Sequence, residues 1–577
     1  MLSIGSRAWV AALLLLLLPA LSCHAFPVDT PPPSGNVQSR PHHLYMDDAR
    51  MDRLGLNQIH ESHESDETDK PTDFSSLDNL SGMHELQRIV GTRNGALFVD
   101  EVGRSRIFHG TNVVFKAWPY VPDIRPDALP KFSFNDIDVA ILRNHSTTAI
   151  RLGVMWAGVE PERGVFNQTY LDIMKSIVSM CSDAGIYVLL DFHQDIFSER
   201  FCGEGVPLWA ANPRSGRFAF PFPLDKAYPV DERGIPSQED CHRHDWATYQ
   251  ATPPVSEAYQ RLYDNYDGYR DAFVEYWKLV AKEMLPFKNV LGYDLINEPW
   301  NGNIGKDPSL SSPIVANRKN LQPFYDVIAE GIRTVDPNAI IFFESVTTIQ
   351  KTVGFQRVPG GSDFASKSVL SYHYYSTVQK QYNLRDTIGF RVNQAAELQC
   401  GSMLTEFEMG NGDGADHGSN VPAVINTARD ADSYFMSYTG WEYTNYVPMT
   451  GTNNGIRNPE TGAVRPGMAA AFSRTYAHAI AGTPTFMEFI DETGEFTLRF
   501  TYSGGRGLAG VTEIRTNFGI HYPQGYVVRI EGGRFKSIAE REGKDSRGSI
   551  FIVPDTTSDE EGGAVEGDEV TVVVART

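Results

Sequence analysis

Eight short apolar runs, separated by stretches with helical spacing, constrain the fold of this chain more than any other feature. Strands that alternate with helices are parallel in their sheet, and eight such strands fit a closed (β/α)8 TIM barrel. The runs are Ile107–Val113, Thr148–Val154, Ile186–Asp191, Val290–Ile296, Ala339–Glu344, Ser368–His373, Ser402–Glu406 and Gly440–Thr444. The helical patterns include Tyr170–Ala184, Ser256–Leu285, Gln322–Val335, Thr427–Tyr438 and Pro466–Ile480.

The pattern changes near residue 483, where short alternating runs are separated by Gly, Asp and Asn. These runs are Phe486–Ile490, Glu495–Tyr502, Gly525–Ile530, Ser549–Val553 and Val570–Val574. Alternation over short segments is typical of an antiparallel β-sandwich. We therefore predict a barrel domain over residues 86–482 and a C-terminal β-sandwich domain over residues 483–577.

The N-terminal region is expected to lie outside both domains. Residues 1–25 contain Arg7, a leucine-rich apolar run and a small residue, Ala25, which together predict a secretory signal peptide. Cys23 fits a lipoprotein attachment site less well, because Ala20 stands where a larger aliphatic residue is expected. Residues 26–85 are acidic and rich in Pro and His, which predicts disorder, with metal binding as the less favoured reading of the His-rich part. The mature protein is expected in the secreted fraction or in the lumen of the secretory or endolysosomal pathway.

Charge and cysteine content narrow the function classes further. With 51 basic and 72 acidic side chains the net charge is −21, which argues against nucleic acid as a partner. Cys202 and Cys241 bracket one irregular segment and form the most plausible disulfide, whereas Cys181 and Cys400 are as readily buried thiols. Cys241-His-Arg-His244 also has the residue types of a zinc site, an alternative that needs further ligands. Asn-x-Ser/Thr triplets at Asn79, Asn144 and Asn167 are compatible with glycosylation.

Two glutamates end predicted strands about a hundred residues apart. Glu298 lies in Tyr293-Asp-Leu-Ile-Asn-Glu-Pro-Trp300, and Glu406 lies in Met403-Leu-Thr-Glu-Phe407. Retaining hydrolysis of a glycosidic bond needs one carboxylic acid and one nucleophilic carboxylate. The pair therefore predicts a retaining glycosidase. Glu408 follows two residues after Glu406 and is a second candidate for the nucleophile if the strand continues.

Other polar residues also stand at predicted strand ends, where a TIM barrel places its active site. They are Arg151, His193, Asn297, His373, Tyr375 and Trp441. Taken singly, each has an ordinary structural explanation, such as an ion pair, a cap or core packing. Their joint occurrence at the ends of successive strands favours a catalytic cleft.

The chain resembles glycoside hydrolase family 5 in four motifs: Arg151-Leu-Gly153, Asn297-Glu-Pro299, His373-Tyr-Tyr375 and Thr405-Glu-Phe407. Asp191-Phe-His-Gln-Asp195 and the following Phe201–Ala210 are similar to the endoglycoceramidases of that family. The resemblance implies Glu298 as acid/base and Glu406 as nucleophile. It implies supporting roles for Asn297, Arg151, Tyr375 and His373, and sugar binding by Lys116, Asp191, His193 and Trp441. It implies no cofactor and no metal.

The expected activity is cleavage of the β-glycosidic bond between oligosaccharide and ceramide. The expected partner is a glycosphingolipid at a membrane or micelle surface, with a detergent-like activator as a further possibility. The aromatic segment Phe197–Tyr228 either forms an apolar wall for the lipid chains or packs on the barrel. Two alternatives stay open: a polysaccharide-directed endoglucanase or mannanase of the same family, and a non-catalytic carbohydrate- or lipid-binding protein.

Overall fold

The structure is a computed structural model. It describes residues 83, 85–93, 95–212, 218–347, 353–376, 382–409, 421–444, 455–541, 547–555 and 564–577. The predicted signal peptide and nearly all of the predicted disordered segment lie outside these residues. Among the helices of the described part, none is both long and apolar enough to cross a membrane.

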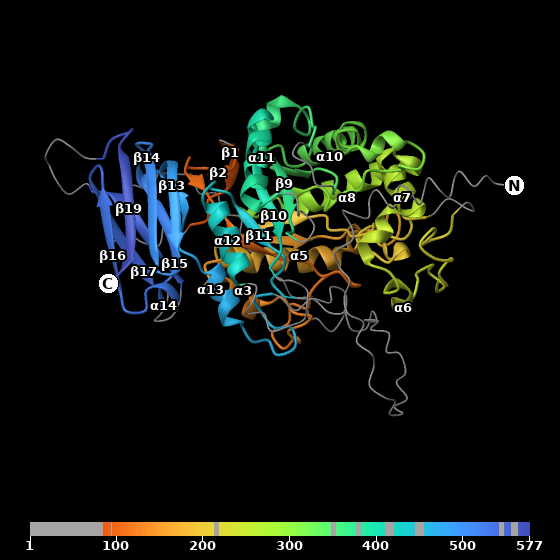
Figure 1. The fold of residues 1–577 in the computed structure, drawn as a ribbon, viewed down its shortest axis with the longest axis horizontal. Helices are drawn as coiled ribbons and strands as arrows, with labels where there is room; N and C mark the ends of the chain where they lie inside the picture. Colours follow the sequence, from red (N-terminus) through yellow and green to blue (C-terminus); the bar gives the residue numbers. More distant parts are fainter. Residues whose placement is uncertain are drawn as a thin grey trace.

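Eight parallel strands close into a barrel, which confirms the predicted fold (Figure 1). The strands are β4 (His109–Val113), β5 (Ala149–Gly153), β6 (Tyr187–Asp191), β7 (Val290–Asp294), β8 (Ile341–Glu344), β9 (Ser368–Tyr374), β10 (Gly401–Phe407) and β11 (Tyr438–Gly440). Nearly every residue in them is buried, since the inner face packs on the barrel interior and the outer face on helices. This explains why the strands are continuous apolar runs.

Most helices surround the barrel and pack apolar faces against its outer surface, whereas the last one packs on the C-terminal sheets (Figure 1). The α-helices of the described residues are α3 (Asp136–Asn144), α4 (Trp156–Val159), α5 (Gln168–Asp183), α6 (Gln238–Cys241), α7 (Pro253–Tyr263), α8 (Tyr269–Met284), α9 (Pro313–Ala316), α10 (Gln322–Arg333), α11 (Leu384–Glu397), α12 (Val421–Asp432), α13 (Pro466–Phe472) and α14 (Phe518–His521). In α5 the side chain of Asn167 accepts a hydrogen bond from the Tyr170 backbone N–H, so this helix begins with a capped turn.

The single helix predicted over Ser256–Leu285 is wrong. Helix α7 ends at Tyr263 and α8 begins at Tyr269. Between them Asn265, Asp267 and Gly268 have φ of 57°, 53° and 75°, a left-handed conformation that ends a right-handed helix. Asn, Asp and Gly tolerate this conformation best, so the break is encoded locally.

Two further boundaries near the end of the barrel differ from the predictions. Helix α12 ends at Asp432, and Tyr438 opens strand β11, so the helix predicted to reach Tyr438 and the strand predicted to begin at Gly440 were placed too late. The helix predicted over Pro466–Ile480 ends at Phe472, and Tyr476–Ile480 forms strand β12. Ala-rich sequence favours a helix there, but pairing with two neighbouring strands decides the outcome.

Two antiparallel sheets, built mostly from strands that follow the barrel, enclose a second core, which confirms the predicted sandwich (the strands after the barrel are blue, at the left in Figure 1). The smaller sheet has the order β13-β14-β19-β16 and the larger has the order β1-β2-β3-β12-β15-β18-β17. Their strands are β1 (Ile89–Arg93), β2 (Leu97–Asp100), β3 (Ser105–Arg106), β12 (Tyr476–Ile480), β13 (Gly482–Ile490), β14 (Glu495–Tyr502), β15 (Thr512–Asn517), β16 (Tyr526–Glu531), β17 (Phe535–Arg541), β18 (Arg547–Pro554) and β19 (Glu569–Arg576).

The larger sheet draws strands from both sides of the barrel in the sequence. Strands β1 to β3 precede the barrel, and β3 pairs with β12, which follows it. The core between the two sheets includes Phe496 and Leu498 from one sheet and Ile514 and Ile550 from the other. The N-terminal strands therefore tie the sandwich to the start of the barrel. The proposed division of the chain at residue 482 stays a prediction.

Candidate active site

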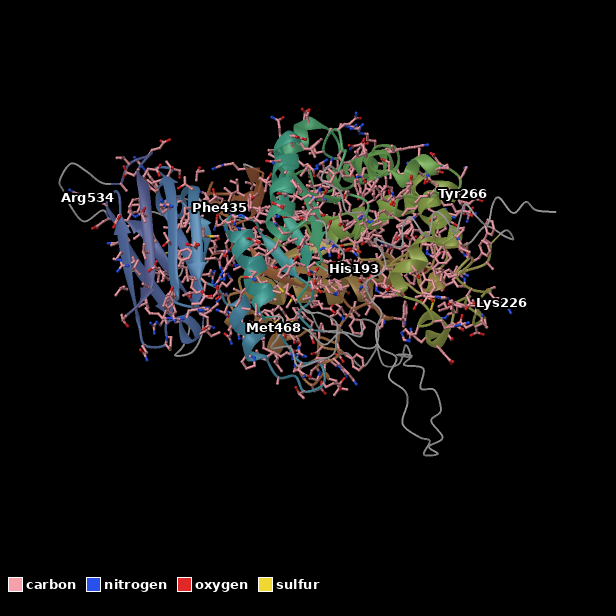
Figure 2. The ribbon with its side chains drawn as sticks, viewed as in Figure 1. His193, Lys226, Tyr266, Phe435, Met468 and Arg534 are labelled. Carbon is pink, nitrogen blue, oxygen red and sulfur yellow. A yellow bond between two sulfur atoms is a disulfide. The ribbon has the colours of Figure 1, made fainter. Side chains whose placement is uncertain are left out.

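The polar residues predicted at strand ends converge at the C-terminal end of the barrel. Arg151 lies in β5, Asp191 ends β6, His373 lies near the end of β9 and Glu406 near the end of β10. All four side chains are buried. Figure 2 shows where His193, which follows β6, lies in the barrel. Barrel closure thus brings together residues that are far apart in the sequence.

Glu298 and Glu406 both approach the Nδ1 atom of His373. One carboxylate oxygen of each glutamate and one ring nitrogen of His373 all lie within 4.8 Å of one another. His373 Nδ1 lies 2.8 Å from Glu298 Oε1 and 3.4 Å from Glu406 Oε2. Carboxyl groups of retaining glycosidases lie about 5 to 5.5 Å apart, whereas inverting enzymes need roughly 6.5 to 9.5 Å to admit a water. The spacing in this site fits retention.

Arg151 is fully buried and contacts several acidic side chains at once. Its Nη1 lies 2.8 Å from Glu406 Oε1, its Nη2 lies 2.9 Å from Asp191 Oδ1, and its Nε lies 2.9 Å from Asp294 Oδ2. Nη2 also donates to Asn297 Oδ1 at 3.0 Å. The buried guanidinium therefore holds the Glu406 carboxyl group in place through a charge-assisted hydrogen bond.

Tyr375 distinguishes Glu406 from Glu408. The Tyr375 hydroxyl donates to Glu406 Oε2 at 2.8 Å, so both oxygens of Glu406 have a donor. Glu408 instead accepts a hydrogen bond from the Ser376 hydroxyl at 2.9 Å. Strand β10 ends at Phe407, so Glu408 lies beyond the strand whose continuation made it a second candidate. Glu406 is the glutamate of this pair that faces Glu298.

Glu298 lies in an environment that favours its protonated form. Burial, and next the negative charge of Asp195, raise the pKa of Glu298 to about 7. Burial is the main cause, and Asp195 is the principal negative charge. Burial also lowers the pKa of His373 to about 4, so its ring is neutral near pH 7 and its Nδ1–H can donate to Glu298.

The residues predicted to bind sugar lie on the other side of the site. The His193 ring is stacked on Trp441, with centroids 5.1 Å apart and an angle of 14° between the planes. Lys116 Nζ lies 4.6 Å from the centre of the Trp441 ring, a cation–π contact. Asp191 Oδ2 lies 2.8 Å from His193 Nδ1, which orients that ring. The geometry therefore combines an aromatic surface with hydrogen-bonding groups.

Two regions of the chain match known family models. The model described as cellulase (glycosyl hydrolase family 5) matches residues 135–447, and the model described as glycoside hydrolase family 5 C-terminal domain matches residues 474–565. The chain belongs to glycoside hydrolase family 5. The resemblance seen in the motifs is thereby confirmed.

Relatives of this family 5 chain include two animal proteins named endoglycoceramidase. The one from Cyanea nozakii is 40% identical over 437 residues, which cover 75% of this chain and 85% of the relative. The one from Hydra vulgaris is 38% identical over 435 residues, which cover 75% and 81%. A crystal structure of an endogalactoceramidase, 20% identical, superposes with a TM-score of 0.61 over 84% of this chain and 99% of that one. At this identity the structural match shows the shared fold.

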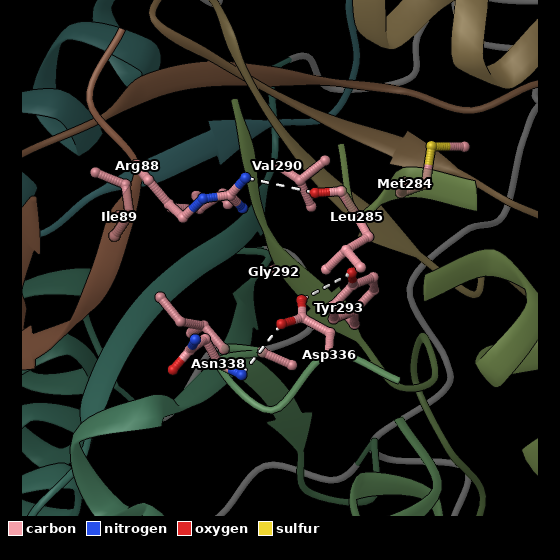
Figure 3. Close-up of a pocket in the computed structure, with 12 residues that line it drawn as sticks. Arg88, Ile89, Met284, Leu285, Val290, Gly292, Tyr293, Asp336 and Asn338 are labelled. Carbon is pink, nitrogen blue, oxygen red and sulfur yellow. Dashed lines mark hydrogen bonds between the residues drawn. The ribbon is translucent and has the colours of Figure 1, made fainter. Parts of the chain in front are cut away.

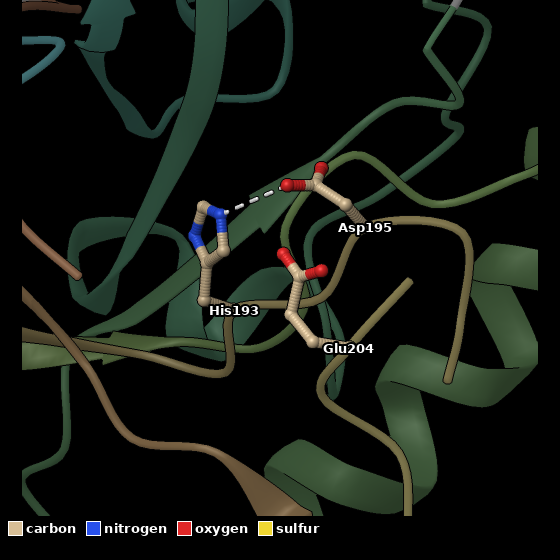
Figure 4. Close-up of side chains that lie close together, drawn as sticks. All are labelled: His193, Asp195 and Glu204. Carbon is tan, nitrogen blue, oxygen red and sulfur yellow. Dashed lines mark ion pairs between the residues drawn. The ribbon is translucent and has the colours of Figure 1, made fainter. Parts of the chain in front are cut away.

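A second acidic cluster lies beside the carboxylate pair of this family 5 site. His193, Asp195 and Glu204 offer ligand atoms close enough to hold a metal ion (Figure 4). However, Lys116 Nζ forms ion pairs with Asp195 and with Glu204, the latter at 3.5 Å. The ammonium group thus supplies the positive charge that a metal ion would bring. Burial raises the pKa of Glu204 to about 8, so this cluster also holds a proton near neutral pH.

The insertion after β6 is closed by a disulfide. Cys202 and Cys241 are bonded, with Cα atoms 5.4 Å apart, which confirms the predicted pair. Cys241 is therefore not available as a zinc ligand, and the hypothesis of a zinc site at Cys241-His-Arg-His244 is wrong. Cys181 and Cys400 are free and buried.

The aromatic side chains of this insertion divide between the two expected roles. Trp209 packs edge-on against Trp156 with centroids 5.2 Å apart, and Phe220 packs on the same core. Phe218 is 42% exposed and stacks on Phe222 at 4.8 Å. Among the described residues of the segment, most aromatic side chains thus pack on the barrel, whereas Phe218 is exposed and its partner Phe222 is half-buried.

A separate crevice lies at the opposite end of the barrel, near the N-terminal ends of β7 and β8 (Figure 3). Hydrogen bonds from Arg88 to the Leu285 carbonyl and from Tyr293 to Asp336 fix its walls. Asp336 is held in turn by the Asn338 backbone N–H. Active sites of TIM barrels lie at the C-terminal ends of the strands, so this crevice is structural.

Sequence reasoning missed four site residues: Gln194, Asp195, Glu204 and Glu344. Asp195 could have been predicted as a site residue, because it ends the motif Asp191-Phe-His-Gln-Asp195. Glu344 ends the fifth predicted strand, and the rule that selected polar strand ends applies to it equally. Glu204 lies in an insertion, and its proximity to Lys116 depends on loop structure that spacing does not reveal.

Proposed function

We propose that this protein is a retaining endoglycoceramidase that releases intact oligosaccharides from glycosphingolipids. The observation that carries the proposal is the pair Glu298 and Glu406, with oxygens within 4.8 Å, in a family 5 chain 40% identical to a protein named endoglycoceramidase. The presence of both carboxylates with Arg151 and Asn297 argues against a non-catalytic binding protein.

In the first step, Glu298 protonates the glycosidic oxygen while a Glu406 oxygen attacks the anomeric carbon. The bond from that carbon to the ceramide oxygen breaks, and ceramide leaves as the alcohol. The sugar remains bound to Glu406 as an ester. Glu298, now a carboxylate, removes a proton from a water molecule, which attacks the anomeric carbon and frees Glu406. Two displacements restore the original configuration.

Neighbouring side chains support these two roles. Arg151 and Tyr375 orient Glu406 through one hydrogen bond to each of its oxygens. Asn297, fixed by Arg151, is suited to bind the sugar 2-hydroxyl, a contact that strengthens in the transition state. His373 donates its Nδ1–H to Glu298 and orients it toward the leaving oxygen.

The sugar in the first subsite is expected to lie on Trp441, with its hydroxyls bound by Asp191, His193 and Lys116. Ion pairs of Lys116 with Asp195 and of His193 with Asp191 keep these side chains in place before substrate arrives, which lowers the entropy cost of binding. We propose that the lipid lies on the side of the exposed Phe218 and the half-buried Phe222, which stack on each other in the β6 insertion.

The proposal extends to where the enzyme works. The N-terminal pattern and the disulfide Cys202–Cys241 support passage through an oxidising secretory compartment. The substrate resides in a membrane or micelle, so a detergent or an activator that presents it should increase the rate.

The test compares lactosylceramide with a lactoside that carries a short water-soluble aglycone, at equal sugar concentration. Burying ceramide methylenes contributes about 0.8 kcal/mol each, so we expect a much higher kcat/KM on the lipid. Cello- and manno-oligosaccharides test the polysaccharide-directed alternative, and Glu406→Gln is the inactive control. Equal kcat/KM on the lipid and the soluble lactoside would contradict the proposed substrate. Hydrolysis of the oligosaccharides alone would also contradict it, and both results would favour a polysaccharide-directed enzyme.

A further inference from the structure

The carboxyl group of Glu344 contacts the backbone of Glu298. No step of the proposed mechanism uses it. Glu344 ends β8 and is 6% exposed. Its Oε2 accepts a hydrogen bond from the backbone N–H of Glu298 at 2.9 Å, and its Oε1 lies 3.8 Å from His373 Nδ1. The Tyr325 hydroxyl donates to the Glu344 backbone carbonyl at 2.7 Å and fixes the strand end.

The backbone of Glu298 needs such support, because its φ is 40°. A residue with a β-carbon seldom adopts this left-handed conformation unless its surroundings impose it. Glu344 holds the N–H side of the residue. On the carbonyl side, Gln194 Nε2 donates to the carbonyl oxygens of Asn297 and Glu298 at 2.7 and 3.2 Å. Gln194 is itself held by the Tyr259 hydroxyl at 2.6 Å.

The charges around Glu344 argue that its carboxyl group is neutral. Glu298, Glu406 and Glu344 all approach the same nitrogen of His373, and like charges this close in a buried site do not all ionise. Burial, and then the charges of Glu298 and Asp294, raise the pKa of Glu344 well above its ordinary value. The titratable and charged groups that face it are Glu298, Asp294, His373, Arg151, Arg391 and Tyr325.

We propose that Glu344 is a positioning residue for the acid/base: it fixes the left-handed backbone of Glu298 and does so as an uncharged carboxylic acid. This inference rests on the proposed role of Glu298. A neutral Glu344 lets Glu298 release its proton to the leaving oxygen without a second negative charge beside it. An ionised Glu344 would oppose that release and hold the proton on Glu298.

Two substitutions separate the parts of the proposal. Glu344→Gln keeps a neutral group with an oxygen acceptor, so we expect kcat/KM within about threefold of the unmodified enzyme and an unchanged alkaline limb. Glu344→Leu removes the acceptor. Because a small displacement of a reacting group costs about 100-fold, we expect kcat/KM on a glycosphingolipid to fall by about that factor, mainly through kcat.

Comparing two substrates shows whether the loss of kcat/KM in Glu344→Leu acts through Glu298. An aryl lactoside with an activated leaving group needs little protonation, so on it the loss in Glu344→Leu should shrink to a few-fold. Glu160→Leu is the matched control, because Glu160 is also buried and accepts a backbone N–H, from Gly164 at 2.7 Å. Equal losses on both substrates in Glu344→Leu would mean a merely structural role and would overturn the positioning proposal.

Whether Glu344 carries a proton can be tested by a measurement that does not depend on activity. Infrared difference spectra of enzyme labelled with ¹³C-glutamate, taken at pH 8, should contain a carboxylic-acid carbonyl band that Glu344→Gln removes. Absence of that band, or a Glu344→Gln variant as impaired as Glu344→Leu, would show that Glu344 is charged and overturn the inference. Failure to cleave glycosphingolipids, with the aryl lactoside still hydrolysed, would refute only the proposed substrate, since the band and the variants remain measurable.

Discussion

The decline of activity above neutral pH should belong to Glu298. Its pKa of about 7 lies well above the ordinary value of 4.5. A glutamic acid with a pKa of 7 is about 90% protonated at pH 6, whereas one with a pKa of 4.5 is about 3% protonated. Burial therefore supplies about 30-fold more of the acid form at pH 6. Because the folded pKa is raised, the acid form persists to pH 7 and is lost above it.

The measurement is kcat/KM against pH, on a glycosphingolipid and on an aryl lactoside with an activated leaving group. On the glycosphingolipid the unmodified enzyme should lose about tenfold per pH unit above 7. Glu298→Ala should lower kcat/KM on the glycosphingolipid by about 10² to 10⁴, and much less on the aryl lactoside. In that variant the alkaline limb near pH 7 should disappear, with Glu298→Gln as the size-matched control.

Persistence of the limb in Glu298→Ala would refute this reasoning. Two other groups in the site titrate in the neighbouring range, since the pKa of Glu204 is raised to about 8 and that of His193 to about 9. If the alkaline limb of the pH profile shifted only in Glu204→Gln, the titrating group would belong to the cluster around Lys116. Equal sensitivity of both substrates to Glu298→Ala would also remove the acid role.

Three further outcomes follow from the site and the insertion beside it. Glu406→Gln should abolish turnover with an unchanged circular dichroism spectrum, and a 2-fluoro glycoside should label Glu406; a label on Glu408 would contradict the assignment. Breaking the Cys202–Cys241 disulfide, which spans 39 residues, should lower the free energy of unfolding by about 4 kcal/mol in denaturant titrations, and recovery of Cys202 and Cys241 as alkylated thiols from the unreduced protein would contradict the bond. Trp441→Ala should lower kcat/KM about tenfold by removing the surface under the sugar, and an unchanged value would place the sugar elsewhere.

The fold could be predicted because the barrel strands are buried on both faces and therefore stand out as apolar runs. The errors occurred where local pattern and tertiary pairing disagree, as at Tyr476–Ile480, whose Ala-rich sequence favours a helix while its neighbours require a strand. Strands β1 and β2 were missed although Asn94-Gly95 between them is a strong hairpin signal. These strands belong to a sheet in which β12, β15, β17 and β18 lie hundreds of residues later in the sequence. Local sequence does not predict such distant pairing.

The site could be predicted to the extent that its residues end strands. This rule found Arg151 and Glu406, because barrel closure brings strand ends together whatever their separation in sequence. It gave no information on burial, and burial is the main reason for the raised pKa of Glu298. The contribution of Asp195 depends on how the chain after β6 folds back over the site, which the motif alone does not specify.

Hydrogen-bond donors are distributed unequally around Glu298 and Glu406. The guanidinium of Arg151 and the hydroxyl of Tyr375 each contact Glu406, one at each oxygen. Glu298 instead receives the single Nδ1–H of a neutral His373, and Asp195 adds a negative charge to its surroundings. At a separation within 4.8 Å, two ionised carboxylates would repel strongly, so one proton shared by the pair should reside on Glu298. Once Glu406 becomes a neutral ester, that repulsion ends and Glu298 is free to act as the base.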